Sequence, residues 1–352
     1  MFTRHILFFF SLVFASYNSM AQLDSLTKSS KHVQHLTLAD TFFGNEDMYQ
    51  VCYPKDHRSM FYFIIIFSIT SIVLGALVIY VKHNANKKLQ EKNTIIAQQN
   101  KDLLDSINYA QHIQNAMLPD VKTHEELLKN GFVFYKPKNI VSGDFYWIHK
   151  CHNLLFVAVI DCTGHGVPGA LLTMLGYNAI NKAVTEKELT DPTHILDSMN
   201  SDVKQALKQT QYQSVQDSME VGIVCIDEQQ KSIKYSGANM SLTLVHNGNL
   251  QVINSGKCSV GSVQSQVIEL PKTHTINLKS GDAFYLYSDG YADQFGGPKG
   301  KKFKYKQLEE LLLANYTKST QEQEALLNDA FIDWKGNLEQ VDDVTVLGYK
   351  FP

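Results

Sequence analysis

Aspartates recur in four short segments where an apolar run begins or ends. The segments are VSGDFYW at 141–147 (Asp144), LLFVAVIDCTGHGVPGA at 154–170 (Asp161), FYLYSDGYADQ at 284–294 (Asp289, Asp293) and VDDVTVLGY at 341–349 (Asp342, Asp343). One such aspartate is ordinary turn chemistry, because Asp and Gly are common where strands end. Several of them at strand ends can instead converge on one rim of a sheet.

Converging carboxylates define the chemistry that this pattern allows. Carboxylates packed within a few Å repel one another and need protons or cations. A site built only from oxygen ligands favours hard ions, Mg²⁺ or Mn²⁺. Two such ions about 3.5–4 Å apart can activate water and hold a phosphoryl oxygen. The chain has only two arginines, Arg4 and Arg58, so no guanidinium is available downstream to hold a phosphate.

Composition excludes several classes of protein. With 32 Lys and Arg against 35 Asp and Glu, the net charge of −3 argues against nucleic acid as the main partner. Hydrophobic residues at 44% and charged residues at 19% fit a globular chain. Five cysteines without a CxxC pair exclude a disulfide scaffold and a cysteine-rich zinc module.

Residues 119–352 are long enough for one large core. Strands are predicted at 154–160, 221–226, 233–236, 242–246, 250–253, 283–288 and 344–349, and helices at about 167–184, 192–210, 306–316 and 320–334. Asn247-Gly248 predicts a hairpin turn, Asp191 a helix N-cap, and Ser319 with Glu322 a capping box. Antiparallel strands with separate helices predict an α+β sandwich.

The order of motifs resembles a known family. GD-F-Y, D-C-T-G-H-G-V-P-G-A, S-D-G and D-D-x-T, in this order, are similar to the protein phosphatase 2C-like (PPM) serine/threonine phosphatases of the SpoIIE-type branch, over about 106–352. SINYAQHIQNAMLP at 106–119 resembles the helical lead-in of membrane-linked members. The resemblance implies a central antiparallel β-sandwich flanked by helices (αββα), with two Mn²⁺ or Mg²⁺ ions in a cleft at one end.

The resemblance also implies the metal ligands. Asp161 would bridge both ions, the backbone carbonyl of Cys162 would bind one of them, and Asp289 and Asp342 would complete the other. Two departures from the family pattern stand nearby. Cys162 replaces a common glycine, which takes up room, and Trp147 stands where a further aspartate often occurs.

Three further residues receive roles from the same resemblance, and His165 departs from it. Asp144 would orient the attacking water or bind a metal directly. Asp293 stands where some members hold an additional, weaker ion, whereas Asp343 is interpreted as a structural neighbour. His165 does not align with the histidine proposed as general acid in eukaryotic members, so it would either reach the leaving oxygen from its own position or pack within its loop.

Two groups of lysines complete the candidate site. Lys136 and Lys138 lie just upstream of Asp144, where some members use an arginine to bind the phosphate, and a lysine can serve there as a point charge. A second group follows Gly296-Gly297-Pro298 and comprises Lys299, Lys301, Lys302, Lys304 and Lys306. It is interpreted either as a basic flap that attracts an acidic phosphoprotein or as a solvated loop.

The N-terminal part has the features of a membrane protein. Residues 1–21 resemble a signal peptide cleaved after Ala21, or an uncleaved anchor, and 22–60 form a short extracytoplasmic segment. Residues 61–81 carry no charge and span roughly 31 Å as a helix, enough to cross a bilayer once. Lysines after residue 81 place the catalytic part in the cytoplasm of a bacterium, at its inner membrane.

Residues 82–118 predict a signalling helix. Leu89, Ile96, Leu103, Ala110 and Met117 recur every seven residues, and Asn86, Asn93, Asn100, Ile107 and Gln114 precede them by three. This heptad pattern predicts a homodimeric coiled coil through 86–117, with an amphipathic helix lying on the next domain as the alternative. His112 is interpreted as a solvated helix residue, not a phosphoacceptor.

The function predicted is hydrolysis of phosphoserine or phosphothreonine by a metal-activated water, without a covalent enzyme intermediate. By resemblance, the substrate is a phosphorylated regulatory protein, of the anti-sigma antagonist type, and the coiled coil controls the activity from the membrane. Two alternatives remain open: a catalytically silent membrane receptor or scaffold of the same fold, and a histidine-kinase-like sensor. The absence of a nucleotide-binding pattern argues against the kinase.

Overall fold

The computed structural model describes residues 57–118, 126–208, 217–262 and 271–352. The predicted signal peptide, 1–21, and nearly all of the segment 22–60 lie outside the described residues. The chain divides into two compact units between Leu89 and Gln90.

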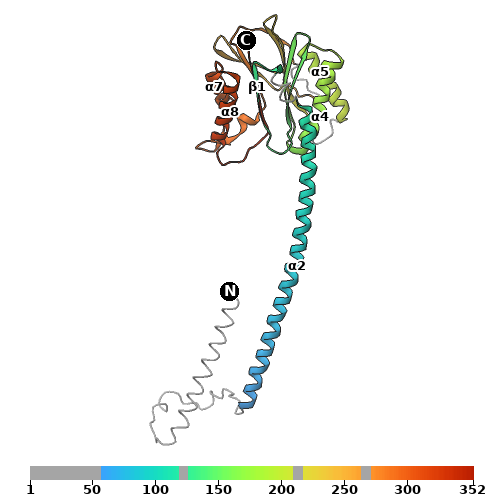
Figure 1. Cartoon of the computed structure of the whole chain (residues 1–352), viewed down its shortest axis with the longest axis vertical. Coiled ribbons are helices and arrows are strands. Elements are labelled where there is room, and N and C mark those ends of the chain that lie inside the picture. The colour runs from blue at the N-terminus through green and yellow to red at the C-terminus, as the bar shows by residue number, and fades with distance from the viewer. Residues whose placement is uncertain (1–56, 119–125, 209–216, 263–270) are drawn as a thin grey trace, which may run out of the picture. The chain divides into compact units, whose positions relative to one another are not determined.

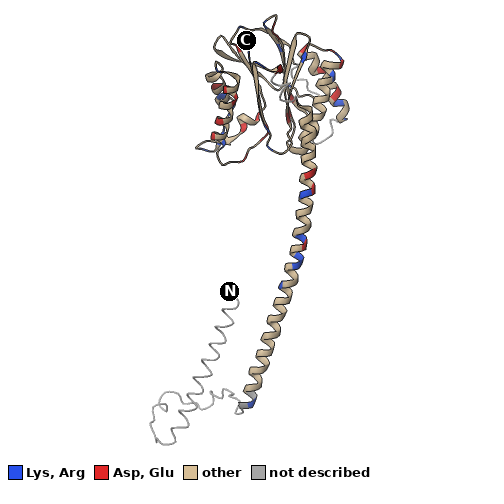
Figure 2. Cartoon of the chain, viewed as in Figure 1, with Lys and Arg blue, Asp and Glu red and all other residues tan. Residues whose placement is uncertain are grey.

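One helix, α2 (His57–Met117), begins in the first unit and continues into the second. The stretch 61–81 lies within it, and Figure 2 shows that part of the helix free of charged side chains. Its large apolar side chains are exposed, with Phe63 and Ile72 at 71% and 70%. The helix is therefore long enough and apolar enough to cross a membrane.

The second unit contains two five-stranded antiparallel sheets. The first has the order β1-β12-β9-β6-β7, with strands Gly131–Lys136, Val344–Lys350, Ala283–Tyr287, Leu242–His246 and Asn249–Ile253. The second has the order β2-β3-β4-β5-β8, with strands Asp144–Cys151, Leu154–Cys162, Met219–Asp227, Ser232–Ala238 and His274–Asn277. Asn247 and Gly248 join β6 to β7 at φ of 50° and 76°, as the predicted hairpin turn requires.

Helices cover the outer faces of both sheets (Figure 1). The second sheet carries α4 (Gly166–Asn181), which continues into a π-helical turn, η1 (Lys182–Glu186), and α5 (Pro192–Leu207). The first sheet carries α7 (Tyr305–Asn315) and α8 (Thr320–Lys335). The caps predicted at Asp191 and Ser319 are both present. The predicted α+β fold, a central antiparallel sandwich flanked by helices, is confirmed.

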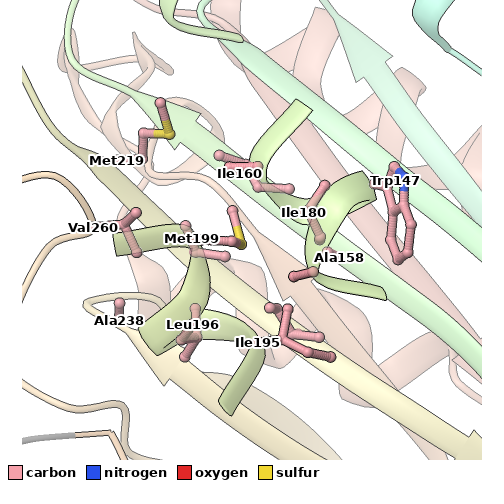
Figure 3. Packing of buried hydrophobic residues seen from close by; sticks show 14 of the residues in the cluster. Trp147, Ala158, Ile160, Ile180, Ile195, Leu196, Met199, Met219, Ala238 and Val260 are labelled. Carbon is pink, nitrogen blue, oxygen red and sulfur yellow. The ribbon is translucent and has the colours of Figure 1, made fainter. Parts of the chain in front are cut away.

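Three apolar layers hold the sandwich together, and β3 contributes to two of them. Its Val157 and Val159 pack between the sheets. Its Ala158 and Ile160 face α4 and α5, and Figure 3 shows them beneath side chains of these helices such as Ile180. Because both faces of β3 are buried, its sequence is continuously apolar instead of alternating, and the strand is held in place up to its last residues.

The C-terminal turns of α2 lie against the sandwich. The less exposed side chains in this part of the chain are Ile107, Ala110, Gln111, Gln114, Met117 and Leu118. Their spacing of three and four residues places them on one helix face. That face includes the predicted coiled-coil seam of the last two heptads. Here the alternative prediction, an amphipathic helix lying on the next domain, describes the packing, while the homodimer through 86–117 stays a prediction.

Candidate active site

Asp144, Asp161 and Glu220 lie side by side on three adjacent strands. Asp144 of β2 is paired with Asp161 of β3, which is paired in turn with Glu220 of β4. Directly opposed residues of antiparallel strands share a face of the sheet and have Cβ atoms about 4.5–5.5 Å apart. The sequence analysis missed Glu220. The available signal was a lone acidic residue at the start of the otherwise apolar segment MEVGIV.

Asp289 and Asp342 belong to loops at the edge of the other sheet. β9 ends just before Ser288 and Asp289, and its antiparallel neighbour β12 begins just after Asp342 and Asp343. The backbone N–H of Ser288 donates to the Thr345 carbonyl (3.0 Å), and the backbone N–H of Thr345 donates to Ser288 Oγ (3.0 Å). These bonds hold the two loops together.

Asp144 connects the two sheets. Its Oδ2 accepts hydrogen bonds from Ser288 Oγ (2.6 Å) and Thr345 Oγ1 (2.9 Å), which both belong to the opposite edge. Its backbone N–H donates to Ser142 Oγ (3.0 Å). Because the side chain is only 2% exposed, these bonds fix how the two edges meet.

Asp144, Asp161, Glu220, Asp289 and Asp342 form what we call the acidic cluster. Burial, and then the charges of its other four members, raise the pKa of Asp161 to about 10. Burial is also the main cause that raises the pKa of Asp144 to about 7, against hydrogen bonds that favour its charged form. Burial and nearby carboxylates raise the pKa of Glu220 and Asp289 as well. A cation beside these groups would relieve their repulsion.

The donors of the acidic cluster fit hard divalent ions. Within the described residues, the carboxylate of Asp161 accepts no hydrogen bond and forms no ion pair, although it is partly buried among like charges. Carboxylate oxygens in such a setting suit Mg²⁺ or Mn²⁺. No group of three or more His, Cys, Asp or Glu side chains in the described ranges is arranged to hold a metal by itself. Backbone carbonyls and water would therefore have to complete the coordination.

The turn after β3 runs close to the loop before β2. Gly164 and Gly166 adopt φ of 86° and 67°, so the chain reverses sharply before α4. A methyl group at Gly143 or Gly169 would overlap the Gly164 carbonyl oxygen, so only glycine fits this crossing. The Cys162 thiol packs into the apolar layer beneath α4 and α5. Replacing the common glycine by Cys162 therefore takes no room from the acidic cluster.

Asp343 anchors the loop before β2. Its two oxygens accept hydrogen bonds from the backbone N–H groups of Lys138 (2.7 Å) and Gly143 (2.8 Å). The residue is buried, at 2% exposure, and both oxygens are used by the protein itself. This is the arrangement expected of a structural neighbour. Asp342 is less buried, and its Oδ1 accepts a bond from the Asp343 N–H (2.8 Å).

Asp293 lies in the short helix α6 (Gly290–Asp293) and has a lysine partner. Lys302 Nζ donates to Asp293 Oδ2 at 2.7 Å. Lys302 belongs to a hairpin formed by β10 (Phe295–Gly296) and β11 (Lys301–Lys302). The ion pair places one lysine of the predicted basic flap beside the acidic cluster, where its charge also acts on Asp289.

The remaining candidates are less closely involved. His165 is exposed at the N-cap of α4 and makes no side-chain cap bond. Lys136 and Lys138 contribute backbone contacts: the Lys136 carbonyl accepts a bond from Gln340 Nε2 (2.8 Å), and the Lys138 N–H is held by Asp343. Neither ammonium group has a hydrogen bond or ion pair within the part of the chain that the structure describes.

The chain resembles known proteins in sequence and in fold. The family model of stage II sporulation protein E (SpoIIE) matches residues 152–352, which includes Asp161, Asp289 and Asp342, while Asp144 lies just before it. The SiaA-PP2C domain of Pseudomonas aeruginosa is 30% identical, with a TM-score of 0.66, and the match covers 72% of this chain and 98% of that domain.

Two more distant structures share the fold. The PP2C phosphatase domain of SpoIIE from Bacillus subtilis, solved with a fragment of its regulatory domain, has a TM-score of 0.50 at 15% identity, and the match covers 63% of this chain and 62% of that one. The RsbU and RsbW domains of Rv1364c from Mycobacterium tuberculosis have a TM-score of 0.50 at 17% identity, over 63% and 60%. No curated protein matches the chain.

Proposed function

This chain belongs to the SpoIIE family of PP2C-type serine/threonine phosphatases, and we propose that it hydrolyses phosphoserine or phosphothreonine on a regulatory protein. The observation that supports the proposal is the convergence of Asp144 and Asp161 from one sheet with Asp289 and Asp342 from the other. Carboxylates that lie this close together can bind divalent ions. Divalent ions bound there can in turn bind the dianion of a phosphate monoester.

Mn²⁺ or Mg²⁺ is the cofactor of this type of enzyme, and we infer two ions here. These ions would be held by the carboxylates of Asp161, Asp289 and Asp342 and by the backbone carbonyl of Cys162. Bound ions lower the pKa of water and neutralise phosphoryl oxygens. Asp293 is a weaker candidate ligand for a further ion, because Lys302 already balances its charge.

Asp144 is proposed as the residue that orients the attacking water and accepts its proton. Ser288 and Thr345 hold its Oδ2, while its Oδ1 accepts no hydrogen bond within the described residues. A carboxylate held in this way can accept a proton from water and release it again. Fixing one oxygen leaves the other with a defined direction.

The leaving group and the phosphate need further residues. We place His165 at the leaving oxygen, to which its exposed imidazole can donate a proton. Lys136 and Lys138 would supply positive charge to the phosphate. Lysine is the available cation because no arginine follows Arg58.

The substrate is proposed to be a phosphorylated signalling protein of the anti-sigma antagonist type. One of the compared structures supports this class of partner, because it contains RsbU and RsbW domains.

We further propose a single-pass protein of the bacterial inner membrane with its phosphatase in the cytoplasm. Residues 61–81 of α2 would cross the bilayer, and Lys82, Lys87, Lys88 and Lys92 would lie on the cytoplasmic side. The homodimer proposed through 86–117 has its exposed apolar seam in the earlier heptads, where Leu89, Ile96 and Leu103 are exposed. Pairing of these heptads would pass a signal to the last turns of α2.

The test is metal-dependent hydrolysis of p-nitrophenyl phosphate by the full chain in detergent. We expect activity with Mn²⁺ or Mg²⁺, none in EDTA, and a loss in Asp161→Asn larger than the roughly 10- to 100-fold that is typical when a residue supporting a metal site is lost. Asp197→Asn, at an exposed aspartate of α5, is the matched control and should retain full activity. Activity that persists in EDTA and in Asp161→Asn would contradict the proposed function.

A further inference from the structure

Gln294 is a polar residue without exposed surface, at the point where α6 ends and β10 begins. Its Oε1 accepts a hydrogen bond from the backbone N–H of Val341 (3.1 Å). Its Nε2 donates to the backbone carbonyls of Glu339 (3.0 Å) and Phe295 (2.9 Å). Because both N–H donors and the oxygen of the amide are used, the side chain has one defined orientation. It connects the β10–β11 hairpin to the chain just before Asp342.

The backbone of Gln294 is fixed as well. Its carbonyl accepts hydrogen bonds from the backbone N–H of Phe303 (2.9 Å) and from Trp334 Nε1 of α8 (3.0 Å). The Gly297 N–H donates to the Trp334 carbonyl (2.7 Å), and the rings of Phe303 and Trp334 meet edge to face with centroids 5.2 Å apart. Gln294 is therefore held firmly enough for its side chain to fix another segment of the chain.

The segment that Gln294 holds has no regular structure of its own. Residues 336–343 form neither helix nor strand, and Glu339 and Val341 are exposed. Gln340 also attaches this segment to β1, because its Nε2 donates to a backbone carbonyl of that strand (2.8 Å). Loss of the Gln294 amide would therefore leave the segment attached to the sandwich, but its N–H and carbonyl groups would turn to water and its position would no longer be fixed.

The contact lies beside two carboxylates of the acidic cluster. Asp342 is the residue after the bound N–H, and Asp289 precedes Gln294 by the single turn of α6. On the strand side of both carboxylates, the bonds between Ser288 and Thr345 join the ends of β9 and β12. Asp289 and Asp342 thus lie between two cross-connections, and both connections are needed to keep the two carboxylates at one spacing.

We propose that Gln294 is a positioning residue that sets the spacing of Asp289 and Asp342, and thereby the affinity of the acidic cluster for divalent ions. The inference rests on the proposed function in that it takes these carboxylates to hold an ion. Residues that orient the ligands of a metal commonly contribute about 10- to 100-fold to its affinity. Gln294 acts through backbone groups, so it fixes the segment without occupying the carboxylate oxygens.

The experiment compares Gln294→Met, Trp334→Phe and Gln307→Met in the full chain in detergent. Methionine keeps the unbranched shape of glutamine but has no amide. Calorimetric titration with Mn²⁺ should show a Kd about 10- to 100-fold higher in Gln294→Met. Trp334→Phe removes one bond to the Gln294 carbonyl but leaves all of its side-chain bonds, and its Kd should stay close to that of the wild type. Gln307→Met, at an exposed glutamine of α7, is the matched control and should equal wild type.

A split between affinity and turnover separates positioning from a general defect in folding. Because the ion affinity is what changes, kcat of Gln294→Met for p-nitrophenyl phosphate should approach the wild-type value once Mn²⁺ is saturating. A kcat that stays low at saturating Mn²⁺, with an unchanged Kd, would count against the proposal.

Hydrogen exchange in EDTA gives a readout that needs neither ion nor activity. In the wild type the Val341 amide should be protected although the residue is exposed, and in Gln294→Met it should exchange about tenfold faster while the amides of β3 keep their protection. An unprotected Val341 amide in the wild type, or a Kd raised equally in Gln294→Met and Trp334→Phe, would overturn the proposal. A wild-type chain that binds Mn²⁺ but hydrolyses no phosphate would instead overturn the proposed function, and the Kd and exchange data would still decide the role of Gln294.

Discussion

Replacing Asp144 by asparagine should stabilise the metal-free protein while abolishing its activity. Burial is the main cause that raises the pKa of this carboxyl from 3.8 to about 7 in the folded chain. Between these values the folded protein binds a proton that the unfolded chain has released. The free energy of unfolding therefore falls as the pH rises from about 4 to about 7, and remains low above it.

The size of the effect follows from the same pKa. A rise of about three units corresponds to about 4 kcal/mol at 1.36 kcal/mol per unit. Asparagine does not ionise, and its side-chain oxygen can still accept the bonds from Ser288 and Thr345. In EDTA, Asp144→Asn should be more stable than wild type by about 4 kcal/mol at pH 8 and by only about 2 kcal/mol at pH 5.

Urea unfolding of the full chain in detergent, followed by tryptophan fluorescence, measures this difference. The chain has two tryptophans, and both lie in the second unit, Trp147 on β2 and Trp334 in α8. Asp197→Asn, which removes an exposed carboxylate, is the control and should change stability little. A variant less stable than wild type, or a gain equal at pH 5 and pH 8, would refute burial of the charge as the cause.

Two further substitutions test the surroundings of the cluster. Lys302→Gln removes the 2.7 Å ion pair with Asp293, so Mn²⁺ should bind up to about fivefold more tightly while KM for p-nitrophenyl phosphate rises. Titration of the activity with Mn²⁺, and with substrate at saturating Mn²⁺, measures both quantities. Lys301→Gln on the same hairpin is the control. An unchanged Mn²⁺ affinity and an unchanged KM in Lys302→Gln would contradict the placement of Lys302 beside the acidic cluster. Gly290→Ala should destabilise by about 1–3 kcal/mol in the urea assay, because its methyl would overlap a backbone carbonyl oxygen. Gly75→Ala, which has open space around it, should leave the sandwich unchanged, and equal stability of both variants would count against the overlap.

Elements with local signals could be predicted from the sequence. The Asn247-Gly248 turn and the cap at Asp191 depend on a few neighbouring residues, and both are present. β1 (Gly131–Lys136) was not predicted, because its strand conformation depends on pairing with β12, more than 200 residues away, from Gly131↔Tyr349 to Lys136↔Val344. Strand pairing over such a separation cannot be predicted from a short segment of sequence.

In the candidate site, too, residues with a local sequence signal could be predicted, and residues placed by distant contacts could not. The order of the acidic motifs predicted that Asp144, Asp161, Asp289 and Asp342 would lie together, because each sits where a strand begins or ends. Glu220 was missed, since only its register opposite Asp161 brings it to the cluster. Gln114 was assigned to a coiled-coil seam because a heptad pattern cannot distinguish a partner helix from the surface of the same chain.

The two hydroxyls that hold Asp144 come from the sheet facing its own. Sliding one sheet past the other by a single residue, about 3.3 Å, would pull both donors out of range. The position of Asp144 therefore depends on the alignment of the two sheets. Substitutions that disturb the apolar layer between the sheets should lower the turnover rate even though they lie far from the substrate. Defects in folding and defects in chemistry should be difficult to separate genetically in this protein.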